Sequence, residues 1–329
     1  MKAVSINKPG GLEELTMVYR DKPIAKTGEV LVKIKASAVN RTDVMKRQNT
    51  SLEKPYPILG VEMAGIIEEN HSDHQELKVG TRVAGIVNEG SYAEYAVLPA
   101  DRAIVLPETI SYDKGAAIPE VFLTAYQTLY WLGKLEKGQT VLIHAGASGV
   151  GTAAIQMAKK ITEAQVIVTA GSFEKLQYCK QLGADKTINY KEEDFSKKVL
   201  EWTNEAGADV ILDFIGASYW KKNLKSIKID GRWVLIGLLG GSKVTEIDLS
   251  KLLAKRVTIA ATLLTPRSDE YKAVLTQEFV KHVLPFFENG EIKPIIDTTF
   301  PLKDAAKAHQ YMEDDKNIGK IILEVDKGE

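Results

Sequence analysis

Short apolar runs separated by proline and glycine fill the first part of the chain, up to about residue 118. In Val30–Ala36, apolar and polar side chains alternate with a period of two, which predicts a strand with one buried face. Gly60–Ile67 and Arg82–Val87 are further apolar runs bounded by turn residues. This pattern predicts a mostly β domain.

From Pro119 onward, strands and helices are predicted to alternate. Apolar residues at helical spacing predict a helix over Glu120–Leu132. Pro119 stands just before it, and proline is favoured at the start of a helix. Apolar runs without alternation are typical of a parallel sheet covered on both faces, so this part is predicted to be a doubly wound α/β (Rossmann) domain. The predicted strands are Thr140–Ala145, Gln165–Ala170, Asp209–Phe214 and Trp233–Leu238, and the predicted helices are Val150–Ile161 and Glu174–Gln181.

The last part of the chain, from Leu263, has a different pattern. It predicts helices around Tyr271–Phe287 and Lys303–Met312, followed by a strand over Lys320–Val325. A single terminal strand needs a partner, so we expect it to join the sheet of the first domain.

Composition narrows the classes of protein to consider. Among 329 residues, 43 Lys and Arg balance 44 Asp and Glu, which argues against a general nucleic-acid or membrane-surface binder. Cys179 is the only cysteine, so neither an intrachain disulfide nor a multi-cysteine zinc site is possible. With no apolar run long enough for a signal peptide or a membrane span, we predict a soluble cytoplasmic protein.

The strongest motif is the glycine loop, His144–Gly151, between a predicted strand and a predicted helix. It approximates G-x-G-x-x-G, with Gly146 and Gly151 outside and Ser148 in the middle position. Small residues let a backbone approach a pyrophosphate, and the helix that follows offers unpaired N–H groups. The alternative is a tight turn that binds nothing; the strand–loop–helix context favours a dinucleotide.

The end of the next strand predicts which dinucleotide. An acidic residue for the ribose 2′-hydroxyl of NAD is expected there, but the chain has Gly171 and Ser172. Ser172 can donate a hydrogen bond to a 2′-phosphate, and Lys175 can add a positive charge. We therefore predict NADPH. In the alternative interpretation, Lys175 is merely solvated and Glu174 binds the ribose.

The histidines do not predict a metal site. His71 and His74 are three residues apart and form at most a weak metal pair, so we interpret them as part of a solvated loop. His144 ends a strand beside the glycine loop, where we expect a partly buried, hydrogen-bonded ring.

Several motifs, in order along nearly the whole chain, carry a family resemblance. They are Ala36-Ser-Ala-Val-Asn40-Arg-Thr-Asp43, Gly60-Val-Glu62-Met-Ala-Gly65, Ala117-Ile-Pro-Glu-Val-Phe-Leu-Thr124, the glycine loop, and Asn317-Ile-Gly-Lys-Ile. The chain resembles the zinc-free medium-chain dehydrogenases/reductases, specifically the NADPH:quinone oxidoreductases of the stress-inducible branch. The resemblance implies a GroES-like catalytic domain in two parts, residues 1–119 and 263–329, around a Rossmann domain of residues 120–262. It also implies a homodimer.

The resemblance assigns roles to individual residues. It places Asn40 and Asn317 at the nicotinamide, and Thr124 and the loop residues Gly146, Ala147, Ser148, Gly149, Val150 and Gly151 at the cofactor. The 2′-phosphate would contact Gly171, Ser172, Lys175 and Tyr190, and the nicotinamide and its ribose would contact Phe214, Ile215, Gly216, Gly237, Leu238 and Leu239. Each assignment has a structural alternative: the asparagines cap turns, Tyr190 packs, and the glycines serve strand ends.

The predicted catalytic residues are Asn40, Ser148 and Tyr56. Relatives of this branch have a tyrosine soon after the Met-x-Arg-Gln segment, whereas this chain has Asn49, Thr50 and Ser51 there. Tyr56 either replaces that tyrosine against a planar substrate or only packs. Where zinc-dependent relatives have cysteine and histidine ligands, this chain offers Ser37–Asn40 and Val61-Glu62, so we expect no metal.

A quinone accepts electrons readily and needs positioning more than a Lewis acid, so quinone reduction is the predicted activity. Reduction of the conjugated double bond of an enone or alkenal is the alternative. A cofactor-dependent RNA-binding or crystallin-like role is a further one, although no basic stripe supports RNA binding. Strand edges near Trp233–Leu239 and Val257–Ala261 are candidates for pairing between subunits.

Overall fold

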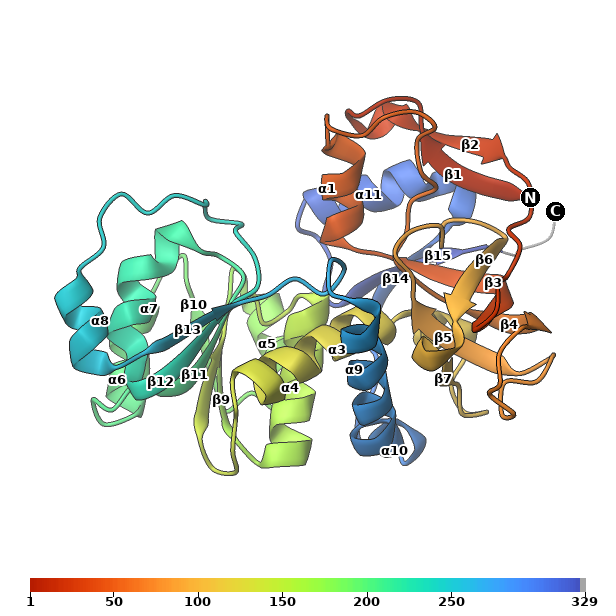
Figure 1. Cartoon of the computed structure of the whole chain (residues 1–329). Coiled ribbons are helices and arrows are strands. Elements are labelled where there is room, and N and C mark those ends of the chain that lie inside the picture. The colour runs from red at the N-terminus through yellow and green to blue at the C-terminus, as the bar shows by residue number, and fades with distance from the viewer. Residues whose placement is uncertain (326–329) are drawn as a thin grey trace. The chain divides into compact units, whose positions relative to one another are not determined.

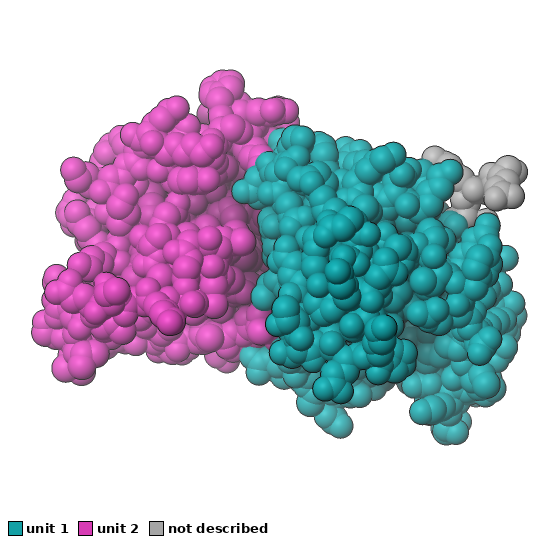
Figure 2. Space-filling view, turned by 90° about the horizontal axis from the view of Figure 1, so that it is seen from above, with its two compact units in different colours: residues 1–123, 265–329 teal, residues 124–264 magenta. Residues whose placement is uncertain are grey.

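The computed structural model describes residues 1–325 and divides the chain into two units. Unit 1 comprises residues 1–123 together with the chain from Thr265 onward, and unit 2 comprises Thr124–Leu264 (Figure 2). Within the described residues, no helix is both long and apolar enough to cross a membrane.

Unit 1 is built on a seven-stranded sheet in the order β14-β15-β3-β4-β5-β7, with β6 also paired to β3. A separate antiparallel pair, β1–β2, lies outside it. The strands are β1 Lys2–Ile6, β2 Leu15–Tyr19, β3 Glu29–Val39, β4 Glu62–Asn70, β5 Arg82–Ile86, β6 Tyr95–Pro99, β7 Ile104–Val105, β14 Ile296–Pro301 and β15 Lys320–Glu324. The longer helices are α1 Arg41–Gln48, α2 Tyr112–Ala116, α9 Asp269–His282, α10 Leu284–Glu288 and α11 Ala305–Glu313, with short turns η1 Leu12–Glu14, η2 Ala100–Arg102 and η5 Leu302–Asp304.

The terminal strand does return to the first sheet, as predicted. β15 pairs antiparallel with β3, so that Ile321 lies opposite Val39 and Leu323 lies opposite Ser37. Its other neighbour is β14, a strand that the sequence pattern did not predict. This pairing brings Lys320 to the end of β3, beside Asn40.

Unit 2 is the predicted parallel sheet, in the order β10-β9-β8-β11-β12-β13. Figure 1 shows α6, α7 and α8 on one side of this sheet and α4 and α5 on the other, which is the doubly wound arrangement. The strands are β8 Thr140–Ile143, β9 Gln165–Ala170, β10 Lys186–Asn189, β11 Ala208–Asp213, β12 Ile227–Leu235 and β13 Thr258–Ala261. The helices are α4 Gly149–Thr162, α5 Phe173–Gln181, α6 Phe195–Trp202, α7 Trp220–Ser226 and α8 Leu249–Lys255, with the short 3-10 helix η4 Ala217–Tyr219. α3 Pro119–Tyr126 crosses the boundary between the units and continues as the π-helix η3 Gln127–Leu132.

One predicted strand is displaced. β12 begins at Ile227 and ends at Leu235, so Ile236–Leu238 form a loop instead of the end of a strand. The first half of β12 was not predicted, because Lys228–Asp230 are exposed and interrupt the run of apolar residues. Asp230 also has a φ of 63°, which is unusual in a strand. The Ile236 N–H donates to the Asp213 carbonyl as the last bond of the β11–β12 ladder, and the Gly237 N–H donates to the same oxygen.

Candidate functional site

The glycine loop has the geometry of an anion site. Ser148 caps α4, and its hydroxyl oxygen accepts a hydrogen bond from the Gly151 N–H at 3.1 Å. Among the described residues, none accepts a hydrogen bond from the N–H groups of Gly149 or Val150. Unpaired N–H groups and the helix dipole together favour a phosphate at this end of α4.

The two outer glycines of the loop are required for close packing. A Cβ atom at Gly151 would lie 2.4 Å from the carbonyl oxygen of Ala145. At Gly146 it would lie 2.9 Å from the Cβ of Val168 on β9. The motif therefore permits the close contact of helix, loop and strand that dinucleotide-binding loops need.

The loop after β9 brings together the residues predicted for a 2′-phosphate. Ser172 caps α5 by accepting from the Lys175 N–H at 3.3 Å. A Cβ at Gly171 would lie 2.8 Å from the Tyr190 hydroxyl, so the tyrosine ring lies directly against this glycine. Tyr190 is 42% exposed, and its ring meets that of Tyr219 edge-on. The residues that follow β9 directly are Gly171 and Ser172, neither of them acidic, and Glu174 is exposed on α5.

The residues predicted to flank the nicotinamide lie in two neighbouring loops. The Leu239 N–H donates to the Phe214 carbonyl at 3.1 Å, and the Gly240 N–H donates to the Ile215 carbonyl at 2.7 Å. A Cβ at Gly237 would lie 2.9 Å from the Phe214 carbonyl oxygen, so glycine is needed there too. Leu238 and Leu239 are more than half exposed.

A buried network that the sequence did not predict holds these loops. One carboxylate oxygen of Asp213 accepts from the Ile215 and Gly216 N–H groups, and the other accepts from Asn223 and from the Trp233 indole at 3.0 Å each. Asn223 in turn contacts Nε2 of His144 at 2.7 Å. Burial lowers the pKa of His144, so its ring is a neutral hydrogen-bonding group, as expected for a structural histidine.

In unit 1, Asn40 belongs to a polar group that we call the Glu62 cluster: the buried Asn40, Glu62 and Lys320 and the partly exposed Glu120. One Glu62 carboxylate oxygen accepts from Asn40 Nδ2 at 2.8 Å and lies 2.7 Å from Lys320 Nζ. The other accepts from the Glu120 N–H at 2.8 Å. Lys320 also donates to the Asn40 amide oxygen at 2.7 Å and to the Val39 carbonyl. The lysine and glutamate are at most 4% exposed, so this is a desolvated ion pair.

A second network supports the Glu62 cluster from the side of α1. Asp43 accepts from the Asn40 N–H at 2.8 Å and from the Tyr92 hydroxyl at 3.2 Å. Tyr92 in turn contacts His309 Nε2 at 3.1 Å, and Arg47 contacts Nδ1 at 3.2 Å. Burial, and then the Arg47 charge, lower the pKa of His309 to about 3, so its ring is neutral. Burial raises the pKa of Asp43 to about 7, against the opposing hydrogen bond from Asn40.

The structure gives the other predicted residues local roles. Tyr56 is half-buried and packs against an apolar cluster that includes Leu59 and Leu302, while Asn317 donates to the Gly319 carbonyl at 2.7 Å. Thr124 is buried, and its carbonyl accepts from the Thr128 hydroxyl. These contacts match the structural alternatives, so the ligand roles of Tyr56, Asn317 and Thr124 stay predictions.

The donor set does not fit zinc. Protein zinc sites use cysteine, histidine and carboxylate ligands, whereas Glu62 is already paired with the Lys320 ammonium. No group of three or more His, Cys, Asp or Glu side chains in residues 1–325 is arranged to hold a metal ion. His71 is exposed and pairs with Glu69, while His74 is partly exposed and pairs with Glu76.

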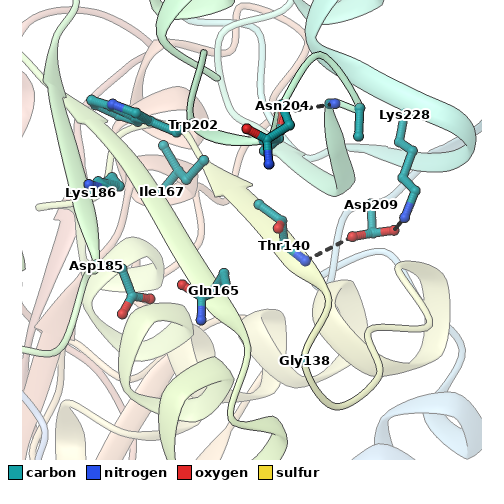
Figure 3. Close-up of a pocket in the computed structure, with 13 residues that line it drawn as sticks. Gly138, Thr140, Gln165, Ile167, Asp185, Lys186, Trp202, Asn204, Asp209 and Lys228 are labelled. Carbon is teal, nitrogen blue, oxygen red and sulfur yellow. Dashed lines mark hydrogen bonds and ion pairs between the residues drawn. The ribbon is translucent and has the colours of Figure 1, made fainter. Parts of the chain in front are cut away.

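A cavity of about 280 Å³ lies elsewhere in unit 2, at the amino ends of its strands. Figure 3 shows Asp209 between the Thr140 N–H, at 2.9 Å, and Lys228, at 2.6 Å. Ligands of doubly wound sheets bind at the opposite, carboxyl ends of the strands, where the glycine loop stands. This cavity is therefore not the candidate site.

Comparisons with known proteins place the chain in a family. Residues 26–108 match the alcohol dehydrogenase GroES-like domain, and residues 149–280 match the zinc-binding dehydrogenase family. Human quinone oxidoreductase is 31% identical over 329 residues, which cover 98% of this chain and 97% of that protein.

Solved structures share the fold over nearly the full chain. Escherichia coli quinone oxidoreductase complexed with NADPH superposes with a TM-score of 0.89 at 29% identity, over 99% of this chain and 100% of that one. An NAD-dependent alcohol dehydrogenase gives 0.88 at 31% identity, over 99% and 100% of the two chains. The JamJ enoyl reductase gives 0.85 at 26% identity, over 98% of each.

Proposed function

Because the chain belongs to the quinone oxidoreductases of the medium-chain dehydrogenase/reductase family, we propose that it is an NADPH:quinone oxidoreductase that works without zinc. The observation that carries the choice of cofactor is the loop after β9. It presents Ser172 in place of an acidic ribose ligand, with Lys175 on the helix that follows and with Tyr190, just after β10, packed against Gly171.

Two sets of residues divide the work in this proposal. In unit 2, the first N–H groups of α4 bind the pyrophosphate, and Ser172, Lys175 and Tyr190 bind the 2′-phosphate. In unit 1, Asn40 serves the nicotinamide and acceptor end. Its Nδ2 is used by Glu62 and the Ala38 carbonyl, so only its oxygen has capacity left for a ligand. NADPH supplies a hydride, and the protein orients the acceptor and excludes water.

The acceptor class follows from the donor set. Without a Lewis acid, a readily reduced quinone is the better substrate than a simple ketone. The similarity to the JamJ enoyl reductase supports the second candidate, reduction of an enone or 2-alkenal. The balanced charge does not support an RNA-binding role. A cytoplasmic location stays a prediction.

The test is NADPH oxidation by the purified protein, with an ortho-quinone or a 2-alkenal as acceptor, each with and without EDTA. Quinone-dependent turnover that EDTA leaves unchanged is the expected result. Turnover with the alkenal alone moves the assignment to a double-bond reductase, and loss of activity in EDTA contradicts the zinc-independent reaction.

If Lys175 binds the 2′-phosphate of NADPH, its removal should affect NADPH but not NADH. Replacing Lys175 by Ala removes a charge-assisted contact to the 2′-phosphate, so the KM for NADPH should rise about tenfold. The KM for NADH should not change, because NADH has no 2′-phosphate. Steady-state kinetics with both cofactors provide the measurement, with Lys160→Ala on the exposed end of α4 as the control. Equal effects on the two cofactors, or none, would remove Lys175 from the site.

We also propose a homodimer in which the two β13 strands pair. β13 is the edge of the unit 2 sheet, and Ile259 on it is 38% exposed. Leu253 on α8 is 77% exposed and Leu263, just after β13, is 62% exposed. An open edge beside exposed apolar side chains favours strand pairing with a second copy.

Light scattering at micromolar concentration should give the mass of a dimer. Ile259→Lys should give a monomer, because a charge on the edge opposes pairing. Ile24→Lys changes a residue that is 84% exposed in unit 1 and should remain dimeric. A monomeric wild type excludes this interface.

A further inference from the structure

The carboxyl group of Glu120 is the one ionisable group of the Glu62 cluster whose side chain has no partner. Glu62 and Lys320 are paired with each other and with Asn40. Glu120 touches the cluster only through its backbone N–H, which donates to Glu62. Within residues 1–325, no hydrogen bond or ion pair involves its carboxyl oxygens. The side chain retains partial exposure, so solvent reaches it.

The start of α3 and a backbone hydrogen bond position the Glu120 side chain. Pro119 begins α3 and Glu120 lies in its first turn. The Glu120 N–H donates to the buried Glu62 carboxylate, and this bond joins the first turn of α3 to β4. The same carboxylate accepts from Asn40. Glu120 is thus held at one side of the same carboxylate that holds Asn40 at the other.

Resting on the proposed function, we propose that Glu120 is the proton donor of the reaction. Reduction of a quinone to a hydroquinone needs two electrons and two hydrogen nuclei. The hydride from NADPH brings both electrons and one nucleus, which leaves a hydroquinone anion. Glu120 gives its carboxyl proton to the anionic oxygen: the O–H bond of Glu120 breaks and that of the hydroquinone forms. Water then reprotonates the Glu120 carboxylate. In a site whose residues do not fit a Lewis-acid metal, a Brønsted acid takes over the neutralisation of this charge.

The surroundings of Glu120 keep it protonated at neutral pH. Desolvation raises its pKa to about 8, and the negative charge of Glu62 acts in the same direction, as does that of Asp43 more weakly. Lys320 and Lys272 oppose these effects, but Lys320 is already paired with Glu62 and Lys272 donates to Asn88 at 2.7 Å. An acid with a pKa near the working pH is well suited to proton transfer.

The variant Glu120→Gln keeps the shape and backbone contact of the side chain but removes the proton. We expect kcat for the quinone at neutral pH to fall about 100-fold, the lower end for loss of a general acid. In the wild type, kcat should be constant below about pH 8 and fall above it, as Glu120 loses its proton; in the variant, this decline should be absent. The Kd for NADPH, measured by fluorescence, should not change. Glu108→Gln, an exposed glutamate of the same unit, is the matched control and should behave like the wild type.

The outcomes separate this role from the proposed function. A wild type that reduces neither quinone nor alkenal contradicts both. An active wild type with an equally active Glu120→Gln, and the same decline above pH 8 in both, overturns only the role of Glu120. A change in the unfolding temperature without a change in the pH profile shows a structural role and overturns it as well. If Glu120→Gln does not fold, Glu120→Asp replaces it: the midpoint of the decline should move, and an unmoved midpoint excludes Glu120.

Discussion

Replacing Lys320 by Met should lower the free energy of unfolding by about 3–5 kcal/mol, because it leaves the Glu62 charge buried without its cation. Glu62 is fully buried and Lys320 is 4% exposed, so water cannot replace the lost ammonium. The same substitution also removes the donor to the Asn40 amide oxygen and to the Val39 carbonyl. Chemical denaturation measured by fluorescence gives the loss directly.

The double variant Glu62→Gln with Lys320→Met provides the decisive control. Glutamine carries no charge, but its single amide oxygen can accept from only one of the two donors, Asn40 Nδ2 or the Glu120 N–H, so part of the lost stability should return. Lys221→Met, which breaks an ion pair of 2.8 Å whose side chains are both more than 75% exposed, should leave the unfolding midpoint unchanged. If Lys320→Met is as harmless as Lys221→Met, the cluster does not depend on its charge pair.

Adding one methyl group at Gly151 should have the largest effect on the nucleotide site. Helix propensity alone predicts that Gly151→Ala stabilises α4, since glycine is the poorer helix former. The structure predicts the opposite sign, because the new Cβ would lie 2.4 Å from the Ala145 oxygen and 2.6 Å from the Gly146 oxygen. Both are backbone atoms, so the loop must move. We expect a loss of about 3 kcal/mol in stability and a Kd for NADPH at least about tenfold higher.

Thermal unfolding and NADPH titration together test this prediction. Lys160→Ala, on the same helix but exposed, controls for the change in helix composition. A Gly151→Ala variant that is more stable than the wild type and binds NADPH normally would show that helix propensity outweighs the close contact.

The sequence predicted the elements whose residues are buried on both sides. β9 was predicted with its observed bounds, Gln165–Ala170, because five of its six residues are buried. β14 was missed because its residues alternate between half-buried and exposed, including Asp297 and two threonines. β10 was missed because it is only four residues long and begins at the exposed Lys186.

The candidate site was predictable where it is local. Ser148, Gly151 and Ser172 act within a few residues of their partners, so a motif captures them. The Glu62 cluster is different, since Lys320 and Asn40 are 280 positions apart and meet only through the pairing of β15 with β3. Glu62, Glu120 and Lys320 all stand in motifs that carried the family resemblance, yet nothing in a linear pattern shows that they contact one another.

The return of β15 to β3 also sets an order in which the chain can mature on the ribosome. Unit 2 is continuous, Thr124–Leu264, so its whole sheet can assemble before synthesis ends. Unit 1 begins earlier but cannot complete its fold until β15 is synthesised, because Lys320 on β15 neutralises the buried Glu62. In a nascent chain, the glycine loop of unit 2 can therefore be complete while Glu62, beside Glu120, still lacks the positive charge of Lys320. Until β15 is synthesised, β3 also presents an open edge with which other chains can pair, so this risk of aggregation lasts until residues 320–324 have been added.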